Sequence, residues 1–598
     1  MNTKYYIWLG LALTLVSTGV RAETVNFDTR VNDLLSQMSL DEKIGQMVQA
    51  DMNAVKDLSD IQKYGFGSML SGGSSDPAAG NTAQDWLNAV NNFKSWALKT
   101  RLKIPLLYGI DAVHGHNNID GAVIFPHHIG LGATRDAKLV EQAERTTALE
   151  VAGTGIRWAF DPCIAVAQNE RWGRTYESFG ESTELVSELG TAAVRGLQGD
   201  LGPNSVLACA KHFLGDGGTQ NGVDQGNTIC DEATLRKLYL PPYRAAIQAG
   251  AKSIMVSYSS WNGKKMHGNK YLLTDVLKGE LGFQGFLVSD WAAIDQISAD
   301  YKSDIEASIN AGQDMIMIPN GPGQKNNYVD FITGLKALVA ENKVSQARID
   351  DAVRRILRVK FQLGLFENPG TDPALTAAIG SAEHRHVARA CVRESLVLLK
   401  NSNHALPLAK NLKRLVVVGE AADDIGVQCG GWTIDWQGRA GAVTHGGTTI
   451  LAAIRQAVSP ETQVIFSSDG NETKGADAIV VVVGERPYAE MKGDRKTLDL
   501  AASDLALIEK AKAAGVPVTT ILFSGRPLVL GRALDASDAF IAAWLPGTEG
   551  QGVADVLFGD FKPTGKLPRA WPASNEQLST SAMQAGKPLF PYGFSLSY

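Results

Sequence analysis

Residues 285–291 read GFLVSDW, a short apolar run that ends in a serine, an aspartate and a tryptophan. The first two-thirds of the chain repeats this arrangement of an apolar run followed by polar or charged residues. The other runs are 104–109 before Asp111, 205–210 before Lys211, 253–256 before Tyr258 and 315–318 before Pro319. Unbroken apolar runs of this length favour strands that are buried on both faces of a parallel sheet.

Helical periodicity fills the gaps between these runs, most clearly over residues 139–152 and 232–249. Alternating strands and helices, with functional groups gathered where strands end, are typical of a (β/α)₈ barrel. We therefore predict an α/β fold whose catalytic domain is a TIM-like barrel over residues 23–365. A doubly wound sheet is the rival architecture, because the sequence identifies only some of the eight strands.

A second strand series begins after a break at Asn368-Pro369-Gly370, so we predict a linker over residues 366–382. The predicted strands of this series are 415–419, 463–466, 478–484, 516–523 and 539–544, with a helix over 502–514. They indicate a second α/β domain over 383–560. We expect the tail, residues 561–598, to pack back across both domains.

Composition excludes several functional classes. The 598 residues are 44% hydrophobic and carry a net charge of −6, which leaves no basic surface for nucleic acid. Five cysteines are too few and too scattered for a disulfide framework. The sequence also lacks a CxxC pair, which would have indicated a zinc site. At most one or two disulfides could form.

The first 22 residues have the pattern of a secretory signal peptide. Lys4 supplies a positive charge, residues 7–16 are largely apolar, and Val20-Arg21-Ala22 provides a cleavage site before Glu23. The apolar run is short for a membrane anchor, which is the alternative. We expect a secreted or periplasmic protein that does not contact the membrane after cleavage.

Asp290 has two interpretations at the end of its predicted strand. A carboxylate there is suited to act as a nucleophile, a base or a ligand, but aspartate is also a common helix N-cap. Position alone does not favour catalysis over capping. The adjacent Trp291 favours a sugar site, because the apolar faces of sugar rings stack on aromatic side chains.

Asp111 lies beside His114 and His116 in DAVHGHNN, and an HxH pair after a barrel strand suggests a metal-dependent hydrolase as an alternative function. Hydrogen bonding within a tight loop is the favoured explanation of the two histidines, because no matching ligands follow later in the chain. Cations beside a pocket also suit either an ion pair or substrate binding. The cations in question are Arg171 and Arg174 in ERWGRTYES and Lys211 with His212 in AKHFLGDGG.

The predicted second domain contributes two further motifs. GERPYAEMKGD places Glu485 and Glu490 on one loop after a run of four valines, and spacing does not choose between them. GGWTIDWQG carries Trp432 and Trp436, which are suited to a sugar-stacking platform or to core anchoring. The Gly- and Ser-rich residues 65–75 lack the full phosphate-binding pattern and predict no nucleotide site.

Together these segments resemble the glycoside hydrolase family 3 enzymes, in particular the two-domain plant-type β-D-glucan exohydrolases. The resemblance runs from MSLDEKIGQM at Met38 to FPYGFSLSY at the end of the sequence. The segments that occur in the family's order are YGIDAVHGHNN, RWGRTYES, AKHFLGDGGT, SYSSWNG, VSDW, GGWTIDWQG and YAEMKGD.

The resemblance implies a (β/α)₈ barrel followed by an α/β sandwich, with the active site between them. It implies a retaining, exo-acting β-glucosidase that releases glucose from β-linked gluco-oligosaccharides or β-glucans and uses no metal or cofactor. Asp290 matches the nucleophile and Glu490 the general acid/base. The residues matching sugar-binding positions are Asp111, Arg174, Lys211, His212, Tyr258, Trp291 and Trp436.

This sequence departs from the plant-type pattern at Gln225 and Gln296, where those proteins carry a glutamate and an arginine, which puts substrate preference in question. Asp216 stands where the N-acetylglucosaminidase branch carries a catalytic histidine, which argues against that branch. A β-xylosidase of the same family is the nearest enzymatic alternative. A non-catalytic sugar-binding protein would need neither Asp290 nor Glu490.

Overall fold

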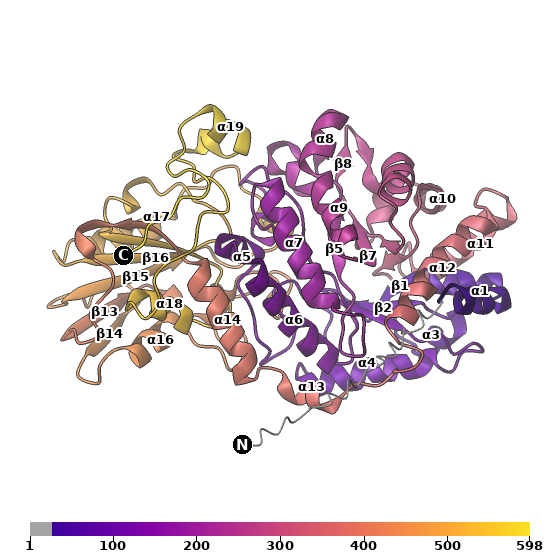
Figure 1. Cartoon of the computed structure of the whole chain (residues 1–598), viewed down its shortest axis with the longest axis horizontal. Helices are drawn as coiled ribbons and strands as arrows, with labels where there is room; N and C mark the ends of the chain where they lie inside the picture. The colour runs from indigo at the N-terminus through magenta and orange to yellow at the C-terminus, as the bar shows by residue number, and fades with distance from the viewer. Residues whose placement is uncertain (1–26) are drawn as a thin grey trace, which may run out of the picture.

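The computed structural model describes residues 27–598, so the predicted signal peptide and its cleavage site lie outside the described residues. The chain forms two α/β units side by side (Figure 1). The first contains the indigo and magenta segments, and the second contains the orange and yellow ones. This confirms the two-domain α/β organisation expected from the sequence.

The first domain contains two parallel sheets. The five-stranded sheet has the order β11 (Ile316–Ile318), β1 (Val48–Asp51), β2 (Ser68–Ser71), β3 (Leu107–Ile110), β4 (Trp158–Ala159). The three-stranded sheet has the order β10 (Phe286–Val288), β7 (Ser253–Val256), β5 (Cys209–Phe213). Parallel bridges connect the two sheets on both sides, between Trp158 and Leu207 and between Val288 and Met315.

Every apolar run predicted as a strand in this domain overlaps one of these strands, and residues 253–256 match β7 at both ends. The sequence analysis did not predict β1, β2 and β4. β1 reads VQAD and β2 reads SMLS, so polar side chains interrupt both even though every residue is buried. β4 has only two residues, too few to give a periodic signal.

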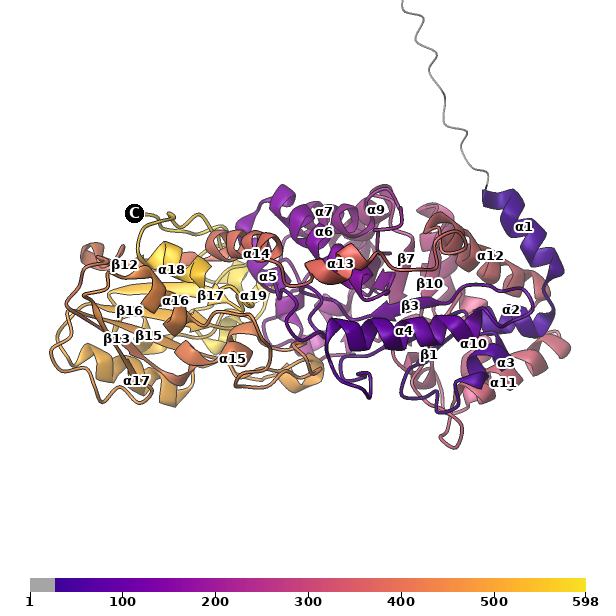
Figure 2. The same ribbon diagram turned by 90° about the horizontal axis from the view of Figure 1, so that it is seen from below.

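Helices cover the outside of these strands (Figure 2). Their bounds are α1 (Phe27–Gln37), α2 (Leu40–Gln46), α3 (Ser59–Tyr64), α4 (Ala83–Ala97), α5 (His128–Thr134), α6 (Ala137–Gly153), α7 (Thr183–Gln198), α8 (Glu232–Leu238), α9 (Leu240–Gln248), α10 (Tyr301–Ala311), α11 (Tyr328–Ala340) and α12 (Gln346–Gln362). Side-chain caps start many of them. The Asp136 carboxylate, for example, accepts from the first free amides of α6.

The helical periodicity of residues 232–249 is confirmed, with one interruption. Residues 232–249 form two helices, α8 and α9, that meet at Tyr239. Pro241 and Pro242 follow in the first turn of α9. Proline lacks an amide hydrogen and clashes with the preceding turn, so it is tolerated where a helix begins and interrupts one that would continue through it.

The second domain is built on a six-stranded sheet. The strand order is β12 (Val397–Asn401), β17 (Ala539–Trp544), β16 (Val518–Phe523), β15 (Ala478–Gly484), β13 (Arg414–Val418), β14 (Gln463–Ser467). All neighbours are parallel except β12, an edge strand that runs antiparallel to β17 and was not predicted. The flanking helices are α14 (Ala382–Ser395), α15 (Ile425–Cys429), α16 (Ile450–Ala457), α17 (Ala502–Lys512) and α18 (Gln551–Leu557).

Two segments lie outside these layers. Residues 366–382, predicted as a linker, include a short helix α13 (Pro373–Ala378), and the Thr376 hydroxyl donates to the Gly153 carbonyl at the end of α6. The tail after residue 561 includes α19 (Thr580–Ala585). Arg569 in this tail donates to the Glu170 carboxylate of the first domain, and both side chains are fully buried.

The five cysteines are unpaired thiols; Cys163, Cys209, Cys391 and Cys429 are buried and Cys230 is half-buried. No disulfide therefore forms, which is compatible with the sequence-based expectation of at most one or two. Among residues 27–598 no helix has the length and apolar character needed to span a bilayer.

Candidate active site

A cavity of about 490 Å³ opens between the two domains. Its lining includes all nine residues that the sequence analysis assigned to catalysis or sugar binding. They are Asp111, Arg174, Lys211, His212, Tyr258, Asp290, Trp291, Trp436 and Glu490. In the first domain most of them follow strands β3, β7 and β10 or lie in the last half of β5, and Arg174 lies in the long segment after β4. The carboxyl ends of parallel strands thus converge on the cavity as the sequence pattern implied.

Asp290 follows β10 by two residues and is 8% exposed. The Trp291 amide donates to Oδ1 over 2.8 Å, whereas Oδ2 has no hydrogen-bond partner. Burial raises the pKa of Asp290 to about 6, and the positive charges of Arg174 and Lys211 oppose the rise. The carboxylate thus presents one free oxygen to the cavity.

Polar side chains from β5 surround this carboxylate. The Lys211 ammonium donates to Asp111 Oδ1 over 3.2 Å. His212 Nδ1 lies 2.8 Å from Asp216 Oδ2, and its Nε2 lies 3.7 Å from Asp290 Oδ2. Burial holds the pKa of His212 well below its usual range, so the imidazole is neutral.

Arg174 connects the two domains at the cavity. Its guanidinium donates twice to the Glu177 carboxylate, over 2.9 and 2.8 Å, and its NH1 lies 3.1 Å from Glu490 Oε1. Arg174 is buried, and these two carboxylates favour its charged form. Trp432 donates from its indole to the same Glu177, which gives Arg174 a rigid support.

Glu490 belongs to the second-domain loop after β15 and has a left-handed backbone, with φ of 52°. Burial raises its pKa to about 8; the Arg174 charge opposes the rise, and the Asp224 and Asp290 charges add to it. A raised pKa suits a carboxyl that must donate a proton. A Cβ on Gly173 would lie 2.0 Å from the Glu490 carbonyl oxygen, so this glycine lets the loop approach the first domain.

Glu485, the other glutamate of the loop, lies elsewhere. Its carboxylate accepts from the Gly525 amide over 3.0 Å and from the Tyr488 hydroxyl over 2.9 Å, and it pairs with Arg526. Glu485 does not line the cavity. The structure thereby separates two glutamates that sequence spacing left equivalent.

The predicted tryptophan platform is divided between two roles. Trp291 is 38% exposed and Trp436 is partly buried at the cavity. Trp432 also borders the cavity but is only 5% exposed and packs in the core of the second domain. Gly72 and Gly73 pass close to these rings. A Cβ at Gly72 would lie 2.7 Å from the Trp291 ring, and one at Gly73 would lie 2.9 Å from the Trp432 ring.

Sequence reasoning missed part of the cavity wall. Asp51 ends β1, is 1% exposed and lines the cavity with Asn53 and residues 72–75. Its Oδ1 accepts from the Asn53 amide over 2.8 Å. The missing signal was strand β1: once β1 is recognised, an aspartate at its carboxyl end becomes a candidate for the same reason as Asp290.

The two glutamines that depart from the plant-type pattern are neighbours. Gln296 donates from Nε2 to Gln225 Oε1 over 3.0 Å, and Gln225 lines the cavity. Lys265 donates to the Gln296 side-chain oxygen over 2.8 Å. The two departures from the plant-type pattern are therefore in direct contact. Two neutral amides occupy the positions where the plant-type proteins carry a glutamate and an arginine.

The HxH motif does not assemble a metal site. His114 bonds through Nδ1 to the Phe125 carbonyl and stacks on His127, whereas His116 bonds through Nε2 to the Thr154 hydroxyl. Within residues 27–598, neither histidine belongs to a group of three potential metal ligands. Both are buried structural histidines, so the metal-dependent hydrolase alternative loses its support.

This arrangement provides a pocket with two carboxyl groups of different pKa, delivered from different domains. The lower pKa suits a carboxylate that attacks or stabilises positive charge, and the higher pKa suits an acid. Tryptophan faces and charged hydrogen-bond donors in the same wall suit a polyhydroxylated ring.

Two family descriptions match nearly all of the chain. Residues 39–359 match the glycosyl hydrolase family 3 N terminal domain, and residues 396–598 match the glycosyl hydrolase family 3 C-terminal domain. The chain belongs to glycosyl hydrolase family 3. The family 3 resemblance seen in the sequence is thereby confirmed, and the chain is a glycoside hydrolase.

Several family 3 proteins are similar to it over most of their length. The crystal structure of an exo-1,3/1,4-β-glucanase from a Pseudoalteromonas species superimposes with a TM-score of 0.91 at 41% identity, over 96% of this chain and 74% of that one. A lysosomal β-glucosidase of Dictyostelium discoideum is 33% identical over 96% of this chain and 77% of its own length. A periplasmic β-glucosidase of Salmonella typhimurium is 32% identical, with 96% and 80% covered.

Proposed function

We propose that this chain is a retaining, exo-acting β-glucosidase that releases glucose from the non-reducing ends of β-linked gluco-oligosaccharides and β-glucans. The observation that carries the proposal is the meeting of Asp290 and Glu490, from different domains, in one cavity that also holds the predicted sugar-binding residues. The names of the similar family 3 proteins, an exo-1,3/1,4-β-glucanase and two β-glucosidases, support this substrate class.

In the first step, Glu490 protonates the glycosidic oxygen while Asp290 attacks the anomeric carbon. A glycosidic oxygen is a poor leaving group without a proton, and the raised pKa of Glu490 keeps that proton available near neutral pH. The free Oδ2 of Asp290 is the attacking atom, since Oδ1 already accepts from the Trp291 amide. The product is a covalent glucosyl-enzyme.

In the second step, the ionised Glu490 removes a proton from water, which attacks the anomeric carbon and releases β-glucose. Two inversions restore the starting configuration. Arg174, held by Glu177, lies beside Glu490 and stabilises its charged form during this step. The hydroxyl groups of the terminal glucose would bind to Lys211, Asp111, His212 and Tyr258. The next sugar would stack on Trp291 and Trp436, which line the same cavity.

We further propose that the eight parallel strands of the first domain close into one (β/α)₈ barrel. The support is the pair of bridges that connects the two sheets on both sides, Trp158 with Leu207 and Val288 with Met315. We propose the domain bounds 23–365 and 383–560 with their linker and tail as the sequence analysis gave them. Residues 1–22 would direct export to the periplasm or the medium and then be cleaved off, as the periplasmic relative suggests.

The decisive experiment compares Glu490→Ala with Glu485→Ala. With a dinitrophenyl β-glucoside, whose leaving group needs no proton, Glu490→Ala should form the glucosyl-enzyme at a near-normal rate and then stall. Added azide should restore turnover and give β-glucosyl azide, because azide attacks without a base. On disaccharides the first step should slow by roughly 10² to 10⁴.

Glu485→Ala is the matched control, because it removes a glutamate from the same loop that lies outside the cavity. It should show neither the burst nor the azide product. Azide rescue of Glu485→Ala alone would exclude Glu490 as the acid/base. A 2-fluoro glucoside should label Asp290, and proton NMR should detect β-glucose first; initial α-glucose would contradict retention. Comparing aryl glucosides with aryl xylosides tests the β-xylosidase alternative.

A further inference from the structure

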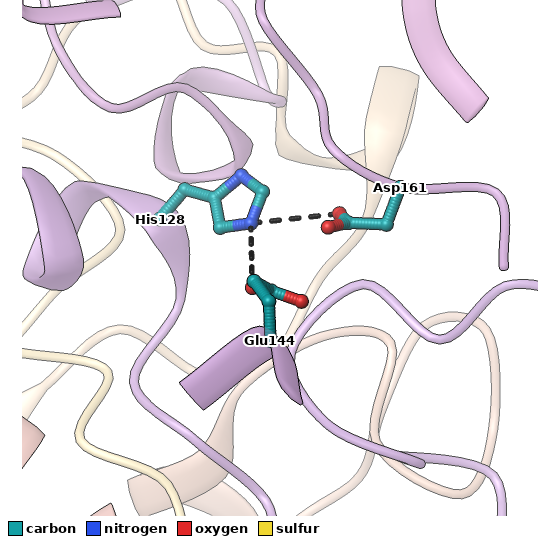
Figure 3. A group of neighbouring side chains, drawn as sticks. All are labelled: His128, Glu144 and Asp161. Carbon is teal, nitrogen blue, oxygen red and sulfur yellow. Dashed lines mark ion pairs between the residues drawn. The ribbon is translucent and has the colours of Figure 1, made fainter. Parts of the chain in front are cut away.

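His128, Glu144 and Asp161 form a buried cluster in the first domain (Figure 3). His128 begins α5, Glu144 lies in α6 and Asp161 follows β4, so three separate elements contribute one side chain each. Their exposed fractions are 1%, 3% and 0%. None of the three lines the active-site cavity, so the proposed glucosidase mechanism does not use them.

The three side chains point toward one another around His128 Nε2. This nitrogen lies 3.8 Å from Glu144 Oε1 and 3.5 Å from Asp161 Oδ1, and one donor atom of each residue lies within 4.8 Å of the others. Such separations exceed a hydrogen bond. They suit an ion between the donors, because tetrahedral bonds of about 2.1 Å keep ligand atoms about 3.4 Å apart.

The donor atoms are also left without partners. His128 Nδ1 lies 2.9 Å from the Glu177 carbonyl, which only accepts, so Nδ1 carries a hydrogen and Nε2 is the ring atom left to bind an ion. Neither Nε2 nor either oxygen of Asp161 has a hydrogen-bond partner. Buried polar atoms nearly always have one, so these unpartnered atoms point to a missing ligand.

We propose that His128, Glu144 and Asp161 bind one divalent transition-metal ion, with Zn²⁺ the best fit. One neutral imidazole and two carboxylates carry a charge of −2, which a divalent cation balances in a site where unpaired charge is costly. A nitrogen ligand and a small ligand number favour zinc over calcium, which takes six to eight oxygens. The three residues are far apart in the sequence and match no short ligand spacing, so the sequence analysis did not single them out.

The ion would have a structural role. It would join α5, α6 and the segment after β4, and the hydrogen bond from His128 to the Glu177 carbonyl connects this cluster to the support of Arg174. A fully buried site gives substrate no access to the metal. The alternative is a metal-free cluster in which one carboxyl keeps its proton. Burial raises the pKa of Glu144 to about 8, which favours a protonated Glu144 in this alternative.

The test measures metal content and thermal stability of the full-length enzyme. We expect one zinc per chain by mass spectrometry after zinc loading and gel filtration. Removal with dipicolinate should lower Tm by several degrees, and stoichiometric Zn²⁺ should restore it. His128→Asn should retain no zinc, and its Tm should not respond to the metal.

His116→Gln is the matched control, because it replaces a buried histidine outside the cluster and should bind zinc as the wild type does. Co²⁺ in the wild-type protein should give ligand-field bands without a thiolate band, which keeps the test independent of whether the variants fold. A wild-type protein that retains no Zn²⁺ or Mn²⁺ and shows no Tm response would overturn the proposal. Equal zinc retention by His128→Asn and the wild type would do the same.

Discussion

At the scale of single residues, the two carboxyl groups of the cavity differ by what surrounds them. Arg174 and Lys211 limit the rise that burial imposes on the pKa of Asp290, which reaches about 6. Glu490 lies beside the same Arg174, but burial and the negative charges of Asp224 and Asp290 raise its pKa to about 8. The proposed mechanism needs Asp290 ionised and Glu490 protonated, and both conditions hold only at a pH between these two pKa values.

We therefore expect a bell-shaped dependence of kcat/KM on pH for a disaccharide. Below about pH 6 Asp290 gains a proton and stops attacking, and above about pH 8 Glu490 loses the proton it must donate. For β-glucosyl fluoride, whose leaving group needs little acid help, the fall at high pH should weaken while the fall at low pH remains. An unchanged alkaline limb with the fluoride would contradict the role given to Glu490.

The Gln225–Gln296 pair gives a second prediction at this scale. Gln296→Arg alone puts a guanidinium beside the Lys265 ammonium without a carboxylate to balance it, so kcat/KM for laminaribiose should fall by roughly tenfold. Adding Gln225→Glu should recover most of the loss, because the two side chains are in contact. A double-mutant cycle on laminaribiose measures this coupling. If the two single effects simply add, the residues act separately.

At the scale of elements, the loop between α15 and α16 brings Trp436 to the cavity while burying Trp432. Its fit depends on Gly73, whose missing side chain leaves room for both tryptophans. A stacking ring contacts the apolar face of a sugar, so it discriminates only weakly between sugars whose hydroxyl groups point in different directions. We expect the enzyme to accept several β-linkages for this reason.

Trp436→Ala should raise KM for laminari- and cello-oligosaccharides by roughly tenfold, the loss of about one stacking contact. Turnover of β-glucosyl fluoride should hardly change, since it places no sugar against that ring. Trp96→Ala is the control, because Trp96 lies in α4 and outside the cavity. Equal losses on both substrates would remove Trp436 from the stacking role.

The sequence was most informative for elements with unbroken apolar runs and for motifs at their ends. β15 and β17 were predicted at their observed bounds because valine- and alanine-rich runs have a sharp start and end. β1 and β12 were missed: polar residues interrupt the first, and the second is an edge strand. Asp51 was missed along with β1. The choice of Glu490 over Glu485 needed the loop's path between domains, which local spacing does not contain.

At the scale of the whole molecule, the proposed active site lies where the two domains meet. The Glu490 loop docks on the first domain through several contacts besides Arg174. The Gly173 amide donates to Asp494 over 2.8 Å, and the Tyr176 hydroxyl donates to the Tyr488 carbonyl over 2.6 Å. Catalysis is therefore sensitive to small displacements of this interface.

Gly173→Ala tests this dependence. Its Cβ would meet the Glu490 carbonyl oxygen at 2.0 Å, so the loop must move away. Activity on disaccharides should fall by roughly 10² to 10⁴, the contribution of a positioned acid, while Tm changes little. Gly202→Ala is the control, because a Cβ there meets nothing within 4 Å. Normal activity of Gly173→Ala would show that the interface tolerates the shift.

The unpaired cysteines have a practical consequence. Burial raises the pKa of the four enclosed thiols, and the reactive thiolate is correspondingly scarce. Nothing in residues 27–598 holds the fold together through a covalent cross-link. The mature polypeptide should consequently assemble equally well in an oxidising or a reducing compartment, without an isomerase, and withstand thiol reductants in storage. Production inside a host cytoplasm, with the leader removed, should yield the same enzyme as export.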